Sequence, residues 1–557
     1  MTSLSDEALA HVTPSAPADG STIDTDARPA MVLVCSDVAR GRTRAAFIES
    51  LEILVDKHFA GEVRVVKNLC AAPAQLSALN EIETQRVIVA CRHGASARDE
   101  VKSVTRRLGI HPAGVAVLDL ASEPRGSTRA FVEHATIQIH AALAGAFSND
   151  LSSPFSEGRS PSAKRYSRRS LFHLRDIARP LSATWKGDRC HCSGRQRACV
   201  DACVFGALTL VGGRIVVDEE RCTGCGACLG TCPSAALSIG GATVATFEEV
   251  ARVLTSTSSQ LAPHPGIAIT CENASTRALA GGEWLSLDVS SLEMVSIGWP
   301  LQLLASGFSV RLAGCSQPRC GSRAHDIVEL CHKLTDQSVV SEVVEPRYEI
   351  GRDAACAELH IVAPHHSLER ECDAIRLREP DATISALSFL SLQGEGEAKR
   401  GEQVAEDSLR LPVEEPLRIE SAYSPMGQVI IKEGACSACG SCAAACPTGA
   451  LSVAEDGDDT SFSLTLDPMA CTACGACLPS CPERAISLQR VIASSNFASA
   501  RTVVARIEVK GRCAVCGSRL VGGLASSIIS QLLTDTHPQL ATRLLQSETC
   551  LECQLLS

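Results

Sequence analysis

Three segments of the chain repeat one cysteine spacing, C-x2-C-x2-C-x3-C-P, and thiolates at this spacing bind cubane iron–sulfur clusters. Three closely spaced thiolates can surround one cluster, while the fourth, three residues further on, points away and ligates a neighbouring cluster. A zinc site needs its thiolates in two separate knuckles, which this spacing does not supply. The three runs are Cys222, Cys225, Cys228 and Cys232; Cys436, Cys439, Cys442 and Cys446; and Cys471, Cys474, Cys477 and Cys481.

The exchange of the fourth ligand requires that such runs come in pairs. The second and third runs form one pair, and the segment between them predicts two strands joined by an acidic turn. This arrangement resembles bacterial ferredoxins that hold two 4Fe-4S clusters. It predicts one cluster on Cys436, Cys439, Cys442 and Cys481, and another on Cys471, Cys474, Cys477 and Cys446.

The run at Cys222 requires a partner as well, and the cysteines upstream of it form a degenerate one. Cys199 and Cys203 keep the last spacing of the run, while the first two cysteines are displaced to Cys190 and Cys192. We expect one 4Fe-4S cluster on Cys222, Cys225, Cys228 and Cys203, and a second on Cys190, Cys192, Cys199 and Cys232. The sequence thus predicts three to four 4Fe-4S clusters in total, with His191 an alternative ligand or a solvent-facing loop residue.

Two further cysteine pairs stand near the carboxyl end, Cys513-x2-Cys516 and Cys550-x2-Cys553. Two matched knuckles of this kind resemble a zinc ribbon or a rubredoxin-like site. Zinc bound by all four thiolates is the first interpretation. A mononuclear iron or another iron–sulfur cluster is the alternative.

Two stretches of alternating strand and helix patterns must position the remaining cysteines. Residues 31–145 contain four short apolar runs separated by amphipathic segments, which predicts a parallel, doubly wound α/β sheet. Ligands of such sheets bind beyond the carboxyl ends of strands. Cys35 and Cys91 lie at such ends and Cys70 opens a following loop, so they are either ligands or small buried residues.

Residues 245–392 predict a second α/β unit, with helices at 247–257, 291–308 and 325–337 and strands at 266–271, 310–315 and 359–364. Cys271 and Cys315 again follow strands, and Cys320 follows closely. This region resembles the delta subunit of methyl-viologen-reducing hydrogenases. The resemblance implies a 2Fe-2S cluster at Cys271, Cys315 and Cys320, although the middle cysteine of that family is replaced by the stretch VSIGWP.

Composition limits the classes of function. The formal net charge of −11 argues against nucleic acid as a partner. No run of 18 apolar residues lacks charge, so no membrane span is predicted. The polar start has no signal-peptide pattern, and many cysteines at metal-ligand spacing favour a reducing cytoplasm over a disulfide scaffold.

The predicted architecture is α/β plus α+β and multidomain, with two doubly wound α/β domains, two ferredoxin-like modules and a small zinc-ribbon-like end. Its parts are a disordered tail (1–30), an α/β domain (31–145), a basic linker (146–185), a ferredoxin-like module (186–241), a second α/β domain (245–392), a linker (393–427), a second ferredoxin-like module (428–492) and a CxxC segment (498–557).

The first α/β region also resembles the amino-terminal region of heterodisulfide reductase A. No GxGxxG follows a strand, so no flavin is predicted. The layout resembles polyferredoxin-like proteins found beside bacterial formate dehydrogenases. It implies an electron-transfer component that serves a dehydrogenase, a hydrogenase-type partner or a ferredoxin.

Two alternatives remain open at this point. One is an iron–sulfur scaffold or maturation factor for a formate dehydrogenase, and the other is a redox subunit acting on a thiol or disulfide substrate. No acid–base pair, nucleophile motif or phosphate-binding loop is recognised, so no catalytic residue is assigned.

Overall fold

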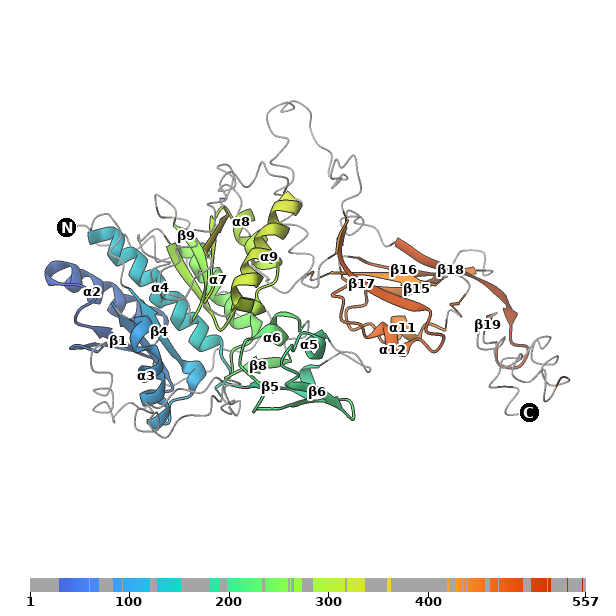
Figure 1. The fold of residues 1–557 in the computed structure, drawn as a ribbon, viewed down its shortest axis with the longest axis horizontal. Coiled ribbons are helices and arrows are strands. Elements are labelled where there is room, and N and C mark those ends of the chain that lie inside the picture. The colour runs from blue at the N-terminus through green and yellow to red at the C-terminus, as the bar shows by residue number, and fades with distance from the viewer. Residues whose placement is uncertain are drawn as a thin grey trace, which may run out of the picture.

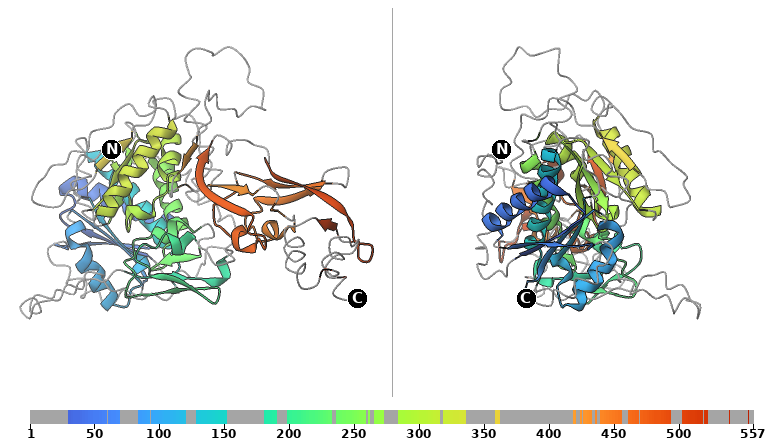
Figure 2. Two further views of the ribbon diagram at one scale, coloured as in Figure 1. Left: turned by 45° about the vertical axis from the view of Figure 1, so that its right-hand side comes forward. Right: turned by 90° about the vertical axis from the view of Figure 1, so that its left-hand side faces the viewer.

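The computed structural model places two α/β units and two ferredoxin-like modules along the chain (Figure 1). The second module projects to one side of the other three parts, as Figure 1 and the left view of Figure 2 show. The structure describes residues 30–59, 61–69, 84–92, 94–120, 128–151, 181–190, 198–232, 236–258, 261, 265–272, 284–315, 318–335, 358–361, 418–420, 424, 426–432, 435–436, 439–455, 461–468, 470–493, 502–517, 519–521, 538 and 553.

The first α/β unit is a parallel sheet in the order β2-β1-β3-β4. The central strands β1 and β3 are almost wholly buried, as expected for a parallel sheet covered on both faces. The predicted strands and three of the predicted helices are confirmed, while the helix expected at 73–80 lies outside the described residues. The elements are β1 (Ala30–Cys35), α2 (Gly41–His58), β2 (Glu62–Val66), β3 (Arg86–Cys91), α3 (Gly94–Arg107), η2 (Pro112–Gly114), β4 (Val115–Asp119) and α4 (Thr128–Ser148).

The second α/β unit has the sheet order β10-β9-β11-β12, in which β12 is antiparallel. The strand β10 was not predicted, although its residues WLSLDV alternate between buried and half-buried positions. The elements are α7 (Val244–Ser258), β9 (Gly266–Cys271), β10 (Trp284–Val289), η6 (Leu292–Met294), α8 (Gly298–Ala305), β11 (Val310–Ala313), α9 (Pro318–Thr335) and β12 (Glu358–Ile361).

The single helix predicted over 291–308 is wrong. The backbone of Ser291 is extended, and its hydroxyl accepts a hydrogen bond from the N–H of Glu293, which starts the one-turn helix η6. A separate helix, α8, begins only at Gly298. Local capping by a serine side chain thus overrides the continuous apolar pattern of the sequence.

The two α/β units join side by side, with α4 packed against α7 between the two sheets (Figure 1). Gln138 on α4 exchanges two hydrogen bonds with the backbone of Ser286 on β10. Lys102 on α3 forms an ion pair with Glu272, 2.6 Å between Nζ and Oε2. Because Glu272 directly follows Cys271, the first unit holds the carboxyl edge of the second sheet in place.

The two ferredoxin-like modules are built from short strand pairs and one-turn helices. In the first, β5 pairs with β8 and β6 with β7, all antiparallel. Its elements are β5 (Ala183–Trp185), η4 (Gly187–Arg189), α5 (Ala198–Asp201), β6 (Leu208–Val211), β7 (Arg214–Val217), α6 (Ala227–Gly230) and β8 (Leu237–Ile239).

The second module has two sheets, β13-β17-β14 and β15-β16-β18-β19. Strand β18 falls in the expected CxxC segment 498–557, yet it pairs with β16 and so continues the sheet of the module. The elements are β13 (Arg418–Glu420), β14 (Gly427–Ile431), α11 (Ser441–Ala444), β15 (Leu451–Glu455), β16 (Ser461–Leu466), α12 (Cys477–Ser480), β17 (Ile486–Ala493), β18 (Thr502–Arg512) and β19 (Arg519–Val521).

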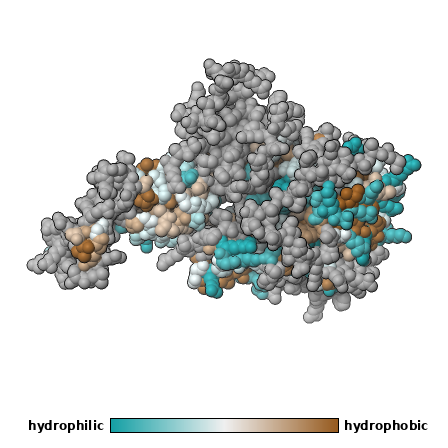
Figure 3. All heavy atoms as spheres, turned by 180° about the vertical axis from the view of Figure 1, so that it is seen from behind, coloured by the Kyte–Doolittle hydropathy of each residue, from teal (hydrophilic) through white to brown (hydrophobic). Residues whose placement is uncertain are grey.

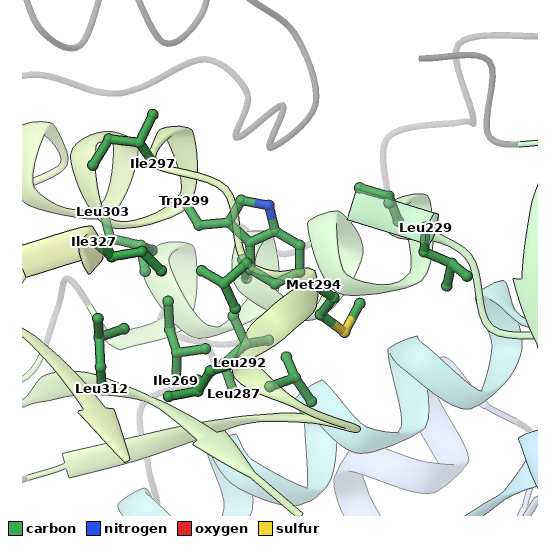
Figure 4. Close-up of a cluster of buried hydrophobic side chains, with 14 of the residues drawn as sticks. Leu229, Ile269, Leu287, Leu292, Met294, Ile297, Trp299, Leu303, Leu312 and Ile327 are labelled. Atoms are coloured by element: carbon green, nitrogen blue, oxygen red, sulfur yellow. The ribbon is translucent and has the colours of Figure 1, made fainter. Parts of the chain in front are cut away.

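One hydrophobic core links the second α/β unit to both modules. Trp299 is its largest buried side chain, and Leu229 of α6 packs into the same cluster (Figure 4). Met426 and Ile492 of the second module are fully buried in it as well. The second module is therefore joined through apolar side chains to the core that the first module and the second α/β unit share.

The face seen in Figure 3 is largely polar over the first α/β unit, with single apolar side chains between. Ile53 on α2 and Val65 on the edge strand β2 are each 47% exposed. Isolated apolar residues of this kind are ordinary on a soluble surface and carry no argument for a binding site.

Two histidines stack inside the first unit, where His140 on α4 lies with its ring centroid 5.8 Å from that of His58. Burial, together with the neighbouring charges of His58 and Arg252, lowers the pKa of His140 to about 4, against a small opposing effect of Glu249. The folded protein therefore holds His140 neutral, while the unfolded chain binds a proton below about pH 6.5.

We expect the free energy of unfolding to fall by roughly 3 kcal/mol from this residue as the pH falls from 6.5 towards 4. Urea unfolding at several pH values should show this loss in the native protein and not in His140→Phe, which keeps an aromatic ring at the site. Comparing the two proteins at each pH cancels effects of acid on other groups. An equal loss in both would contradict the assignment to His140.

Candidate iron–sulfur and metal centres

Each complete run of cysteines turns sharply at a glycine placed directly after its second cysteine. Gly226, Gly440 and Gly475 all have positive φ angles, +80°, +74° and +75°. This left-handed conformation costs a residue with a side chain about 1–2 kcal/mol, so glycine is required there. A one-turn helix (α6, α11 or α12) follows each turn.

The thiols of the first run are gathered in the interior. Burial raises the pKa of Cys228 well above its usual value, and the nearby thiols Cys225, Cys222, Cys199 and Cys203 add to the rise. The backbone N–H of Ala183 donates to the sulfur of Cys222 at 3.3 Å. Such a group of crowded thiols holds protons tightly until a metal replaces them.

The structure thus brings Cys203 of the degenerate run beside Cys225 and Cys228 of the complete run. Cys232 is buried, and the N–H of Ala236 donates to its sulfur at 3.3 Å. Cys190 packs half-buried against the same core. His191 and Cys192 lie outside the described residues, so the structure leaves the fourth ligand set of the prediction incomplete.

In the second module, thiols of both runs surround Cys477. Burial raises the pKa of Cys477 to about 12, and the neighbouring thiols of Cys471, Cys474, Cys442 and Cys446 add to the rise. Cys446 also lies near Cys471, whose pKa burial raises to about 11. The third and fourth cysteines of the second run therefore both lie near the third run.

The other half of the second module is more open. Burial raises the pKa of Cys442 to about 11, and the thiols of Cys436 and Cys439 add to the rise. Cys439 is exposed, and its thiol donates to the hydroxyl of Ser441 at 3.3 Å. The sulfur of Cys481 accepts a hydrogen bond from the N–H of Ala485 at 3.3 Å.

A third kind of site lies in the second α/β unit, where the sulfurs of Cys271, Cys315 and Cys320 all lie within 4.8 Å of one another. Cys271 ends β9, Cys315 follows the adjacent strand β11, and Cys320 lies in the first turn of α9. Since β10 and β11 flank β9 on opposite sides, these strand ends form the switch point at which α/β sheets bind ligands.

The N–H of Leu292 donates to the sulfur of Cys320 at 3.5 Å, and the thiol of Cys271 donates to the carbonyl oxygen of Ser290 at 3.5 Å. The neighbouring thiols of Cys271 and Cys315 hold the pKa of Cys320 below its usual range. All three cysteines are buried, at 6% exposure or less. Three converging sulfurs are a donor set that fits a thiophilic metal or an iron–sulfur centre.

At the carboxyl end, the sulfurs of Cys513, Cys516 and Cys553 also lie within 4.8 Å of one another. Cys513 is buried directly after β18, whereas Cys516 is exposed. Cys550, the fourth predicted ligand, lies outside the described residues. Three of the four predicted ligands are thus gathered at one point.

The other predicted switch-point cysteines, Cys35 and Cys91, are fully buried at the ends of the adjacent strands β1 and β3. Cys70 lies outside the described residues. Among the described residues, these two positions show packing inside the sheet, and we assign them no ligand role.

Three charged residues beside the cysteine groups carry no sequence motif and were not predicted. Glu293 and Arg319 lie between the first module and the three-cysteine site, and Arg490 lies beside Cys474 and Cys471. Glu293 falls within the stretch wrongly predicted as one helix. The contacts of all three residues join segments distant in sequence, so only the tertiary structure reveals them.

Comparison with known families agrees with the cysteine geometry. Residues 435–485 match the family described as 4Fe-4S dicluster domain, and residues 215–238 match the 4Fe-4S binding domain. The chain therefore contains ferredoxin-type 4Fe-4S domains, which are units of iron–sulfur electron transfer. A comparison with curated proteins finds no match.

The degenerate run at Cys190–Cys203 lies outside both matched stretches, since the first match begins at residue 215. Among the helices in the described part of the chain, none is long and apolar enough to span a membrane.

Proposed function

We propose that this protein is a multi-cluster electron carrier that exchanges single electrons with a redox partner of the dehydrogenase or hydrogenase type, such as a formate dehydrogenase. The observation that carries the proposal is the paired gathering of thiols, in which Cys446 of the second run lies near Cys471 and Cys477 of the third. Two-cluster ferredoxins use this arrangement to hold two clusters close together.

The proposed ligand sets follow the crossing. Cys222, Cys225, Cys228 and Cys203 would hold one 4Fe-4S cluster, and Cys190, Cys192, Cys199 and Cys232 a second. In the second module, Cys446 would complete the cluster of the third run, and Cys481 that of the second run. Backbone N–H groups that donate to Cys222, Cys232 and Cys481 would stabilise the charged, reduced form of such clusters.

Two further centres belong to the proposal. Cys271, Cys315 and Cys320 would hold a 2Fe-2S or related iron centre, supported by their burial and their convergence at the switch point. Cys513, Cys516, Cys550 and Cys553 would hold zinc in a closed four-thiolate site that fixes the end of β18.

The rival proposal of a scaffold or maturation factor predicts a different behaviour of the same thiols. A scaffold releases its clusters to another protein, so its ligands must be accessible. Cys222, Cys228 and Cys232 are each less than 9% exposed, which favours a resident cluster over a transferable one. A role on a thiol or disulfide substrate would use the three-cysteine site, where all three sulfurs are buried in the described structure.

Metal analysis and redox titration of anaerobically purified protein test the proposal together. We expect about 16 iron atoms from four cubane clusters, two or fewer more from the three-cysteine site, and about one zinc. Reduction and reoxidation should be reversible, with iron retained through several cycles. An iron content near eight atoms per chain would mean that the first module holds no clusters. Transfer of iron to an apo-acceptor would favour the scaffold.

A further inference from the structure

The short helix η6 lies between the first ferredoxin-like module and the three-cysteine site. On one side, a Cβ added to Gly230 of α6 would overlap the carbonyl oxygen of Met294, and one added to Gly226 would lie 3.0 Å from the Met294 Cβ. Figure 4 shows Met294 between Leu229 of α6 and the core of the second α/β unit. On the other side, the N–H of Leu292 donates to the sulfur of Cys320. The three residues of η6 thus contact both the first ferredoxin-like module and the three-cysteine site.

The middle residue of η6 makes the connection polar as well. The carboxylate of Glu293 lies close to the sulfur of Cys225. Burial raises the pKa of Glu293, while the charge of Arg319 lowers it. Arg319 lies on α9 directly before Cys320, with its Nη1 3.8 Å from the Glu293 Oε2. A ligand of the first module and the neighbour of a ligand of the three-cysteine site therefore share one carboxylate.

A residue just after the degenerate run, Phe205, also contacts Arg319 and adds to the junction at η6. The guanidinium of Arg319 lies over the ring of Phe205, 5.5 Å from its centroid. Phe205 follows Cys203 by two residues, and Cys203 is the proposed crossing ligand of the same cluster as Cys225. Arg319 thus touches the surroundings of both ligands.

The first module also shares packing and charge with the second. Met426 and Ile492 of the second module are buried in the core that holds Cys199 of the first. Arg490 of β17 donates to the backbone oxygens of Ser424 at 2.8 Å and Ala473 at 3.1 Å. Burial lowers the pKa of Arg490, while the charges of Cys474, Cys471 and Asp201 raise it. Asp201 ends α5, the helix that carries Cys199.

We infer that these junctions form one electron path along the molecule, from the second ferredoxin-like module through the first to a redox-active iron centre at Cys271, Cys315 and Cys320. The inference rests on the proposed function, and it assigns η6 and Arg319 as the last junction of the path. At the final step one electron passes from a reduced 4Fe-4S cluster to ferric iron held by the three cysteines. The cluster is oxidised and the iron reduced by one electron each, with no bond made or broken and no proton required.

An electron path that ends at the three-cysteine site requires a redox-active metal there. Zinc has no redox chemistry, so a zinc ion there would end the path without function. Iron at the same thiolates can accept the electron, and the buried position at the switch point keeps it adjacent to a ligand site of the α/β sheet. In this arrangement Glu293 is a positioning residue, since it acts through Cys225 and Arg319.

Electron paramagnetic resonance of the reduced holoprotein tests the inference. Two paramagnetic centres held this close should broaden or split each other's signals. The paired clusters within each module already split each other's signals, so the test is an additional interaction with the three-cysteine centre. We expect this additional splitting in the native protein, and only the splitting between paired clusters in Cys320→Ser and in Cys315→Ser, which each remove a ligand of the centre. Cys331→Ala is the matched control, because Cys331 is buried on the same helix α9 but lies outside the group, and the splitting should persist.

Glu293→Gln tests the junction itself. The measurement is the reduction potential of each centre, which a purely structural role of Glu293 would leave unchanged. Loss of the negative charge should raise the reduction potentials of the first-module cluster and of the three-cysteine centre together, and leave those of the second module unchanged. The same splitting in the native protein and in Cys320→Ser with iron at the centre, zinc at the centre, or no metal there would each overturn the inference. A holoprotein without any 4Fe-4S signal would instead overturn the proposed function.

Discussion

Removal of iron from the holoprotein should unfold the second ferredoxin-like module while the first α/β unit stays folded. Three of the eight buried residues in the core of the module are cysteines that would ligate clusters: Val429, Cys442, Ala450, Leu451, Leu464, Leu466, Cys471 and Cys477. Units of this size bury too little apolar surface to fold without metal, and metal binding then supplies much of the folding free energy. The loss of this metal-binding free energy is larger than the net free energy of unfolding of a small domain.

The first α/β unit provides the internal control for this experiment. Its core contains no proposed cluster ligand and is built from Val32, Leu33, Phe47, Ile88 and other apolar side chains at 1% exposure or less. Limited proteolysis after anaerobic chelation should therefore cut within residues 428–492 and spare residues 30–120. Protection of the second module in iron-free protein would show that its fold does not depend on the clusters.

The crossing of ligands in the second module should produce a reciprocal pattern of cluster loss. Cys481→Ala should remove the cluster held by Cys436, Cys439 and Cys442, and so match the effect of Cys436→Ala. The reason is that the fourth cysteine of each run points to the other cluster. The position of Cys446 beside Cys471 and Cys477 gives the structural basis for the converse substitution.

Cys446→Ala and Cys471→Ala should accordingly give a second, shared spectrum that differs from the first. Iron analysis should show a loss of about four iron atoms in each of the four variants, one cubane cluster each. Mössbauer or paramagnetic resonance spectra then decide the pairing. If Cys481→Ala instead gave the spectrum of Cys471→Ala, each run would hold its own cluster and the crossing would be wrong.

The two results bear on the electron path in different ways. Loss of the inner cluster at Cys471, Cys474 and Cys477 would remove the cluster beside Arg490. Loss of the outer cluster, beside the exposed Cys439, would leave the surroundings of Arg490 unchanged. The open side at Cys439 is consequently where we expect a redox partner to exchange electrons with the second module.

The sequence alone determined the chemistry of the ferredoxin-like modules, because cluster ligation depends on short, local spacing. The turn at Gly226, Gly440 and Gly475 follows from the glycine that the local sequence places there. The strands of the first α/β unit were equally predictable, since buried parallel strands are continuous apolar runs bounded by breakers.

Local patterns failed where a side chain or a partner strand decided the backbone. Ser291 caps η6 and divides a stretch whose apolar periodicity predicts one helix. The alternating strand β10 forms because β9 offers it a partner. The pairing of β18 with β16 likewise depends on a sheet edge that lies 36 or more residues away in the sequence.

Only the tertiary structure decided which cysteines lie close together across the chain. The convergence of Cys271, Cys315 and Cys320 depends on the order in which β9, β11 and α9 pack, and the spacing of these residues does not specify it. The junctions at Glu293, Arg319 and Arg490 join segments that are distant in the chain through single polar contacts. Such contacts leave no periodic trace in a sequence, since each requires only one residue of the right charge at a position that packing alone brings into reach.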